Sequence, residues 1–435
     1  EMVSWVNRQV IAPLDIQALE ADGRTGDFLI AKAAYSLRSL GTRQATLAAT
    51  GDTVARADGK FVVQVRRSSD DTLKSFTADE VTDGTLLAFV TDAQIGWNVQ
   101  PTFSNDSGTG SVTSQSSTAT TATVSFTGEA SLIREASKPN HVLGSSGDQV
   151  IFNISVSGLD STGILRLRTS GTNTTVGSSN VSNGDNQDIT LNLTGSAGYL
   201  AMTFVASSGG TITFNSIKVL PKTGFVKTWY DQSVTNEAGS TPTGNHAVQA
   251  TAAEQPLIVS AGSLVPDNGI DMNNNFLVAP SVSGLTGSLS MFCASVKVAN
   301  GTPMSLSSSS SNSRYFLISE STSTSTVSPR NTLTGAAAVP SVSGNERLTF
   351  ALTTGATFTA GGANGGAVVT STADYGDDFS GSNLDQITIG IYRTVSQAGS
   401  YNGRIREILV YDSDQTVNRG AIEANIGEAY SITGI

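Results

Sequence analysis

Short runs of alternating apolar and polar residues, separated by turn-forming residues, constrain the fold of this chain more than any other feature. In the middle of the chain they cover 150–156, 164–168, 189–193, 200–205 and 212–219. A period of two is typical of β-strands that bury one face, and regular spacing is typical of sandwiches and barrels. Further runs cover 61–67, 225–230, 289–298, 314–319, 346–353, 366–370, 386–393 and 402–411. The sequence therefore predicts an all-β fold.

The composition agrees with strands whose outer faces carry hydroxyls rather than charges. Charged residues make up 14% of the 435 residues and apolar residues 38%, which is enough for cores when each sheet buries one face. A chain of this length suits two or three domains. The single cysteine, Cys293, lies in an apolar strand pattern and is expected to pack as a small hydrophobic residue. Internal disulfides therefore do not hold the fold.

Three segments show helical spacing instead of alternation. Residues 27–40 predict a first helix with Asp27 as its N-cap, and 83–91 predict a second with Asp83 as its cap. A third is expected near 416–430, at the end of the sequence. The prediction is thus a β protein with a few short helices.

The charge balance argues against several kinds of partner. Lysine and arginine number 25 against 36 acidic residues, a formal net charge of −11, and no basic run occurs. Nucleic acid and anionic membranes are therefore not expected partners.

No apolar stretch is long enough for membrane insertion, and no signal peptide is visible. Because Glu1 precedes Met2, we expect residue 1 to arise from processing or from a longer chain.

Three stretches carry a resemblance to a known family. They are AYSLR at 34–38, VRRSSDD at 65–71 and TWYDQS at 228–233. Their order resembles the start of the fungal α-L-arabinofuranosidase B catalytic domain and of its non-enzymatic relatives in tailed-phage fibre and tail proteins. Residues 245–250 and 255–259 resemble the elements that come next.

Two further stretches resemble the closing strands of β-sandwiches. Residues 402–411 resemble the last strand of laminin-G-like, concanavalin-like sandwiches, and 212–219 resemble the last strand of carbohydrate-binding-module jelly rolls. The resemblance implies a concanavalin-like β-sandwich with an inserted second β-sandwich, a jelly roll. The expected organisation is an N-terminal arm at 1–20, the first part of the laminin-G-like sandwich at 21–98, the insertion at 99–221 and the second part of the outer sandwich at 222–435.

The best ligand-binding candidates lie in one element of this resemblance. Trp229, Tyr230, Asp231 and Gln232 follow one another at the end of a predicted strand. In a functional interpretation, Asp231 bonds a sugar hydroxyl and an aromatic ring stacks on the sugar face. In a structural interpretation, Asp231 and Gln232 cap local backbone while Trp229 fills the core. The structural interpretation is favoured.

A hydrolytic function requires two carboxylates on one sugar site, about 5–5.5 Å or 6.5–9.5 Å apart. The candidates are Asp70, Asp71, Asp231, Asp377, Asp378 and Glu407. The cysteine-rich catalytic region of the fungal enzyme has no counterpart here, so no catalytic residue is assigned and the chain is not expected to be an enzyme. The two histidines, His141 and His246, fall in different predicted domains, which argues against a histidine-based zinc site or a Ser-His-Asp triad.

No cofactor is expected, with one alternative left open. Oxygen-rich loops around Asp374, Asp377 and Asp378 offer ligands of the kind that Ca²⁺ prefers. No Asp-x-Asp-x-Asp-Gly loop accompanies them.

The resemblance leads to three hypotheses about function. The first is a bacteriophage virion surface protein of the tail fibre, tail tip or head decoration. It would lie outside the cell, contact other virion proteins, form a homo-oligomer and bind host surface glycans without catalysis. The second is a decoration protein that cements the particle without binding glycans, anchored by Val3, Trp5 and Val6. The third is a glycoside hydrolase acting on host polysaccharide.

Overall fold

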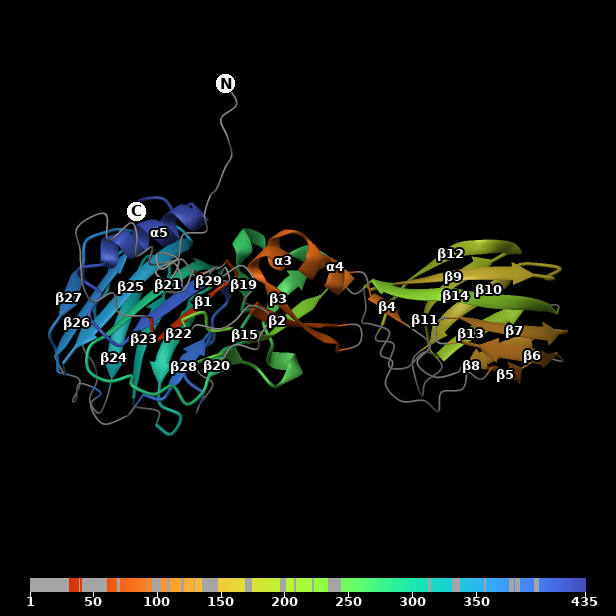
Figure 1. Cartoon of the computed structure of the whole chain (residues 1–435), viewed down its shortest axis with the longest axis horizontal. Helices are drawn as coiled ribbons and strands as arrows, with labels where there is room; N and C mark the ends of the chain where they lie inside the picture. Colours follow the sequence, from red (N-terminus) through yellow and green to blue (C-terminus); the bar gives the residue numbers. More distant parts are fainter. Residues whose placement is uncertain are drawn as a thin grey trace, which may run out of the picture.

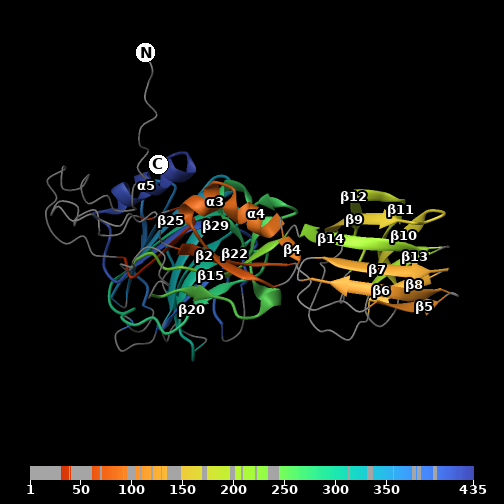
Figure 2. The same ribbon diagram turned by 45° about the vertical axis from the view of Figure 1, so that its right-hand side comes forward.

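The predicted fold class is confirmed: the chain is all-β, with large antiparallel sheets and a few short helices. Figures 1 and 2 show two β-sandwiches lying end to end. The computed structural model describes residues 31–38, 40, 61–68, 71–91, 93–95, 103–107, 110–118, 121–128, 130–134, 148–168, 174–195, 201–206, 209–220, 223–233, 244–311, 314–330, 337–355, 357–374, 379, 384–394 and 399–435. The arm predicted at 1–20 lies outside these ranges.

The larger, outer sandwich is built from both ends of the described chain. Its strands are β1 (Ala33–Ser36), β2 (Phe61–Arg67), β3 (Leu73–Thr77), β15 (Gly224–Trp229), β16 (Ala247–Val248), β17 (Leu257–Ser260), β18 (Ser263–Leu264), β19 (Ile270–Asp271), β20 (Leu277–Ala279), β21 (Leu289–Lys297), β22 (Gly301–Ser307), β23 (Tyr315–Glu320), β24 (Ser325–Arg330), β25 (Glu346–Thr354), β26 (Phe358–Ala363), β27 (Val369–Ser371), β28 (Gln386–Ile389) and β29 (Gly403–Tyr411). Its helices are α3 (Ala78–Thr82), α4 (Thr85–Thr91), η3 (Ala252–Glu254), η4 (Pro266–Asn268) and α5 (Arg419–Tyr430).

Most of these strands form two layers, which are linked through β17 because β17 pairs with both β15 and β19. One layer runs β27–β26–β25–β21–β29, with β1 and β19 both paired to β29. The other runs β24–β23–β22–β28–β20–β16–β15–β2–β3. The main hydrophobic cluster fills the space between them, and Cys293 is buried in it as predicted. A second cluster lies between the first layer and α5, which covers that sheet in Figure 1.

The smaller sandwich has two sheets and its own core. Its strands are β4 (Ala93–Ile95), β5 (Phe103–Ser107), β6 (Ser111–Ser117), β7 (Ala122–Thr127), β8 (Ala130–Arg134), β9 (Gln149–Ser157), β10 (Gly163–Arg168), β11 (Thr175–Val181), β12 (Gly184–Asn192), β13 (Ala201–Ala206) and β14 (Gly210–Leu220). One sheet has the order β11–β10–β13–β8–β5 and the other β12–β9–β14–β7–β6, with β4 paired to β14. Its hydrophobic cluster runs from Ala122 to Ile217 and shares no residue with the outer clusters.

The smaller sandwich is inserted between neighbouring elements of the outer one. The chain leaves the outer sandwich after α4 and returns at β15, which pairs with β2 in the register Gly224 to Arg67. The two connections are close together, because β4 on the way in pairs with the end of β14 on the way out, Ala93 opposite Val219. An inserted domain leaves its host sheet intact in this way. The boundaries at 99 and 221 stay predictions, because residues 96–102 and 221–222 lie outside the described ranges.

The helix predicted over 27–40 is wrong for the part that the structure describes. Residues 33–36 form β1, which pairs with β29 from Ala33 opposite Val410 to Ser36 opposite Glu407. The apparent helical spacing came from small residues that also fit a buried strand, and all four β1 residues are buried. Long-range pairing with β29 outweighs local helical preference here.

The other two predicted helices are confirmed, with bounds that differ from the prediction by at most three residues. The Asp83 carboxylate accepts a hydrogen bond from the Thr85 amide at 2.8 Å, at the start of α4. A short helix, α3, was not predicted. It begins with a capping box, in which Thr77 and Glu80 each accept from the backbone amide of the other. The Thr-x-x-Glu pattern that signals it was present in the sequence.

Hydroxyl pairs cover the outer face of the β12–β9–β14–β7–β6 sheet. Thr123 on β7 pairs with Thr213 on β14 at 3.0 Å between hydroxyl oxygens, and Ser125 pairs with Thr211 at 2.8 Å. The amide of Asn215 continues the row by donating to Asn153 at 3.0 Å. Cross-strand pairs of this kind stabilise a sheet without charges.

A buried carboxyl group lies inside the outer sandwich. Glu320, at the end of β23, accepts hydrogen bonds from the Ser295 hydroxyl at 2.5 Å and the Tyr401 hydroxyl at 2.8 Å. Burial raises the pKa of Glu320 above its ordinary value of 4.5, although these two hydroxyls and the charges of Arg347 and Lys297 act to lower it. The folded protein thus favours the protonated form more than the unfolded chain does.

This raised pKa predicts how stability depends on pH. When the pKa of a carboxyl group is higher in the folded than in the unfolded state, the group stabilises the fold fully at pH values below its unfolded-state pKa. This contribution is lost as the pH rises through the folded-state pKa. The glutamine of Glu320→Gln does not ionise, so this variant lacks that pH-dependent contribution. The unfolding free energy of Glu320→Gln relative to wild type should therefore increase as pH rises from near 4.5. Urea unfolding at a series of pH values measures this, and a difference independent of pH would contradict it.

Candidate functional site

The four predicted ligand-binding residues lie at the end of β15 and are buried. Trp229 is 0% exposed, Tyr230 5%, Asp231 1% and Gln232 4%. The Trp229 ring packs against Tyr35 of β1, with ring centroids 5.8 Å apart. The Tyr230 ring meets His246 edge-on at 5.2 Å. No large ring face of this element is left open for stacking on a sugar.

The Asp231 carboxylate bonds only to the protein's own backbone among its described contacts. Its Oδ1 accepts from the amides of Ala34 and Ser233, each at 2.9 Å, and its Oδ2 accepts from the amide of Asn245 at 2.9 Å. The Asp231 amide donates to Nδ1 of His246 at 3.1 Å. The carboxylate therefore joins β1, the turn after β15 and the segment before β16.

Gln232 performs the same task one residue further along. Its Oε1 accepts from the Leu40 amide at 2.8 Å, and its Nε2 donates to the carbonyls of Ser36 and Arg38 at 2.8 and 3.2 Å. Together, Asp231 and Gln232 hold the strand that the sequence had suggested was a helix. This arrangement favours the structural interpretation of the element.

The candidate catalytic carboxylates are engaged where the structure describes them. Glu407 is fully buried and forms a two-point ion pair with Arg38, at 2.7 and 2.9 Å. Asp71 is exposed and pairs with Arg66 at 2.6 Å. Asp70, Asp377 and Asp378 lie outside the described residues.

The proposed calcium ligands are not brought together in the described part of the chain. Asp374 is exposed, and its two suggested companions are among the residues that are not described. Within the described ranges, no group of three or more histidine, cysteine, aspartate or glutamate side chains is placed to hold a metal ion. The helices in those ranges are all too short or too polar to cross a membrane.

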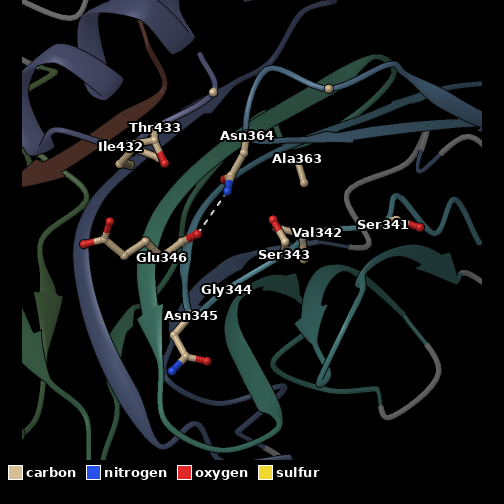
Figure 3. A pocket seen from close by; sticks show the side chains of 12 residues that line it. Ser341, Val342, Ser343, Gly344, Asn345, Glu346, Ala363, Asn364, Ile432 and Thr433 are labelled. Carbon is tan, nitrogen blue, oxygen red and sulfur yellow. Dashed lines mark hydrogen bonds between the residues drawn. The ribbon is translucent and has the colours of Figure 1, made fainter.

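A pocket that was not predicted opens at one end of the outer sandwich, beside the start of β25. Its volume is about 510 Å³, within the range of small-ligand sites. Three stretches of chain form its walls: the approach to β25, the turn after β26 and the segment after α5 (Figure 3). They contribute Ser341, Val342, Ser343, Gly344, Asn345, Glu346, Ala363, Asn364, Gly366, Ile432, Thr433 and Gly434.

The turn after β26 sets the shape of this pocket. Asn364 has a left-handed backbone, φ +47°, which asparagine tolerates better than most residues. Its side chain fixes the turn to β25, because Oδ1 accepts from the Leu348 amide at 2.7 Å and Nδ2 donates to the Glu346 carbonyl at 3.0 Å. Figure 3 shows the second bond as a dashed line. The pocket wall is thus a braced turn.

The pocket is lined mainly by neutral hydrogen-bonding groups. Ser341, Ser343, Asn345 and Thr433 are exposed and carry hydroxyl or amide groups. Glu346 supplies the one carboxylate among the lining residues, and Arg406 holds it with an ion pair of 2.9 Å. Such a surface can donate and accept several hydrogen bonds at once, but the Glu346 carboxylate is the single acidic group among the lining residues. No sequence signal pointed to it, because its three stretches are far apart in the chain.

Comparisons with known proteins give only distant likenesses. No protein-family model matches the chain, and no curated protein matches it significantly. Among solved structures, a mutant of NanB sialidase from Streptococcus pneumoniae is 20% identical over 34% of this chain and 26% of that one, with a TM-score of 0.30. The Ruminococcus gnavus IT-sialidase CBM40 bound to alpha2,3 sialyllactose is 15% identical over 35% and 85%, with a TM-score of 0.27.

A third similar structure covers more of this chain. Mouse laminin alpha1 chain domains LG4-5 are 10% identical over 61% of this chain and 82% of that one, with a TM-score of 0.27. This chain spans only about a quarter of the length of NanB sialidase. With TM-scores this low, none of these likenesses identifies a ligand or an activity for this protein.

Proposed function

We propose that this protein binds glycans without transforming them, and that the pocket beside β25 is a binding site for them. The main observation behind the proposal is that hydroxyl, amide and backbone groups line this pocket, whose volume is about 510 Å³. Sugars present many hydroxyls that both donate and accept, so they suit a site of many neutral partners. Hydrolysis by a carboxylate pair requires two acids, and the lining holds one.

Filling the pocket should abolish this binding. Ser343 is exposed in the pocket wall, so the indole of Ser343→Trp would occupy the ligand's space without disturbing the core. We expect affinity for a bound glycan to fall by about tenfold or more, which corresponds to ~1.4 kcal/mol. The purified chain is titrated against bacterial surface polysaccharides, with binding and reducing-end release measured together.

A matched substitution separates blocking from a general effect of tryptophan. Ser114 is exposed on β6 of the inserted sandwich, and Ser114→Trp should bind as wild type does. Equal affinity of Ser343→Trp and wild type would remove the pocket as the site. Release of reducing ends by the wild-type chain would replace the binding role with a hydrolytic one.

The resemblance to tailed-phage fibre and tail proteins supports a location on a phage particle for the protein that binds these glycans. We propose that the protein is displayed on a phage particle, outside the cell, beside other virion proteins and in several copies. Weak single sites would then gain strength by acting together. Antibody labelling of intact particles in the electron microscope tests this, and particles that bind no antibody would contradict it.

A further inference from the structure

A second cluster of recognition chemistry lies on the outer face of the sheet that contains β22, β23, β24 and β28. Tyr315 on β23 is directly opposite Arg330 on β24 and Ser307 on β22, and Ser307 is opposite Gln386 on β28. Directly opposed residues of antiparallel strands share a face. The alternate residues, such as Phe316, belong to the core between the two layers. The row Gln386–Ser307–Tyr315–Arg330 therefore points away from the core.

A second tyrosine is brought beside this row by the segment that follows β28. The ring centroids of Tyr315 and Tyr392 are 4.8 Å apart and the rings are perpendicular. Two hydrogen bonds hold the segment near the row: Thr394 Oγ1 donates to Gln386 Oε1 at 2.8 Å, and Thr388 Oγ1 reaches the Tyr392 carbonyl at 3.5 Å. Both tyrosines remain partly exposed, so their rings are available at the surface.

Two guanidinium groups face this tyrosine pair. Arg393 lies with its guanidinium carbon 4.2 Å from the Tyr392 ring centroid and donates to the Tyr392 hydroxyl at 2.7 Å. Burial and the neighbouring Tyr315 hydroxyl raise the pKa of Tyr392, while the charges of Arg393 and Arg330 act to lower it. Arg330 is directly opposite Tyr315 in the strand register and Arg393 contacts Tyr392, so both cations lie at the tyrosine pair.

Part of this cluster has unused hydrogen-bonding capacity. The Nε of Arg330 and the Oγ of Ser307 are buried and find no hydrogen-bond partner among the residues that the structure describes. Arg330 takes part in none of the ion pairs among the described residues. A guanidinium that pairs with none of the described carboxylates is notable in a chain with a net charge of −11. Arg330 as a whole is only partly buried, so an incoming anion can pair with its guanidinium in the two-point geometry that these groups favour.

We propose that this tyrosine–arginine cluster is a second glycan site and that it selects carboxylate-bearing sugars. The sugar face stacks on the exposed part of a tyrosine ring, because C–H faces favour aromatic π-surfaces. The sugar carboxylate pairs with Arg330, beside Arg393. This extends the proposed function by naming the ligand class, but it uses none of the pocket residues.

The test compares an acidic with a neutral oligosaccharide on the whole chain. The probes are trigalacturonic acid, the neutral galactotriose and inorganic sulfate, each titrated by calorimetry. We expect trigalacturonic acid to bind more tightly than galactotriose, and its affinity to fall about tenfold or more in Arg330→Gln. Tyr392→Ala should lower it as well, whereas Tyr392→Phe, which keeps the ring, should lower it less.

Controls distinguish this site from the pocket and from misfolding. Arg166→Gln, a matched change on the inserted sandwich, should leave trigalacturonic acid binding unchanged. Ser343→Trp, which blocks the pocket, is titrated beside it to separate the two sites. If Arg330→Gln shows a changed circular dichroism spectrum, Arg330→Lys replaces it and should bind more weakly through loss of the planar fork.

Three outcomes would overturn the proposal. They are equal affinity for the acidic and neutral oligosaccharides, full affinity in the Arg330 variant, or displacement of trigalacturonic acid by sulfate at equal concentration, which would indicate an anion contact without sugar recognition. Loss of binding in Ser343→Trp alone would assign the acidic glycan to the pocket and leave the proposed function standing.

Discussion

Replacing Asp231 with asparagine should destabilise the outer sandwich strongly. The carboxylate is 1% exposed and accepts three backbone amides, those of Ala34, Ser233 and Asn245. An asparagine side chain has one acceptor oxygen, and its NH₂ group would face an amide donor. Hydrogen bonds to charged groups contribute more than neutral ones, so we expect a loss of about 3 kcal/mol or more in the free energy of unfolding.

Fluorescence during urea unfolding measures this loss, because Trp229 lies in the same core. Asp185→Asn is the matched control, since Asp185 is exposed on β12 of the inserted sandwich. It should change stability by no more than about 0.5 kcal/mol. A loss below about 1 kcal/mol in Asp231→Asn would show that the three amides do not depend on the carboxylate charge.

Breaking the Arg38–Glu407 ion pair from one side should cost more than removing both partners. Glu407 is buried, and its second contact is the Tyr430 hydroxyl at 3.1 Å. Arg38→Met leaves a buried carboxylate without its cation, at a cost of about 3–5 kcal/mol in unfolding free energy. The double variant Arg38→Met with Glu407→Leu leaves neither charge, and Tyr430 keeps the Arg406 carbonyl as a partner at 3.1 Å.

A double-mutant cycle compares the unfolding free energies of wild type, Arg38→Met, Glu407→Leu and the double variant, and it measures the coupling between the two side chains. We expect the double variant to be more stable than Arg38→Met. Additive losses would mean that each side chain acts alone, for example Arg38 through its bond to Asn425 at 2.7 Å.

Alternating strands could be predicted from the sequence because their signal is local. The runs at 61–67, 289–298 and 346–353 correspond to β2, β21 and β25, which differ from them by a residue or less at either end. β1 could not be predicted in the same way. Its residues are Ala33, Ala34, Tyr35 and Ser36, and their conformation is set by β29 and by Asp231, both far away in the chain.

The candidate sites were harder to predict than the strands, for a related reason. The Trp-Tyr-Asp-Gln element stood out in the sequence because its residue types can bind sugars, yet the same types brace buried backbone. The pocket lining is ordinary serine, asparagine and glycine from three separate stretches. Tyr315 and Tyr392 meet only because the segment after β28 folds back toward β23. Proximity of this kind is created by the tertiary fold and leaves no local pattern.

The junction between the sandwiches has a mechanical consequence. The strand that enters the insertion, β4, is hydrogen-bonded to the end of β14, the strand that leaves it, from Ala93 opposite Val219 to Ile95 opposite Ile217. Only three residues separate Leu220, at the end of β14, from Gly224, at the start of β15. A pull on the far end of the inserted sandwich is therefore shared by two short connections. One connection joins the outer sandwich at β15, which is paired with β2, and the other joins it at the end of α4, so the pull acts on both of these places.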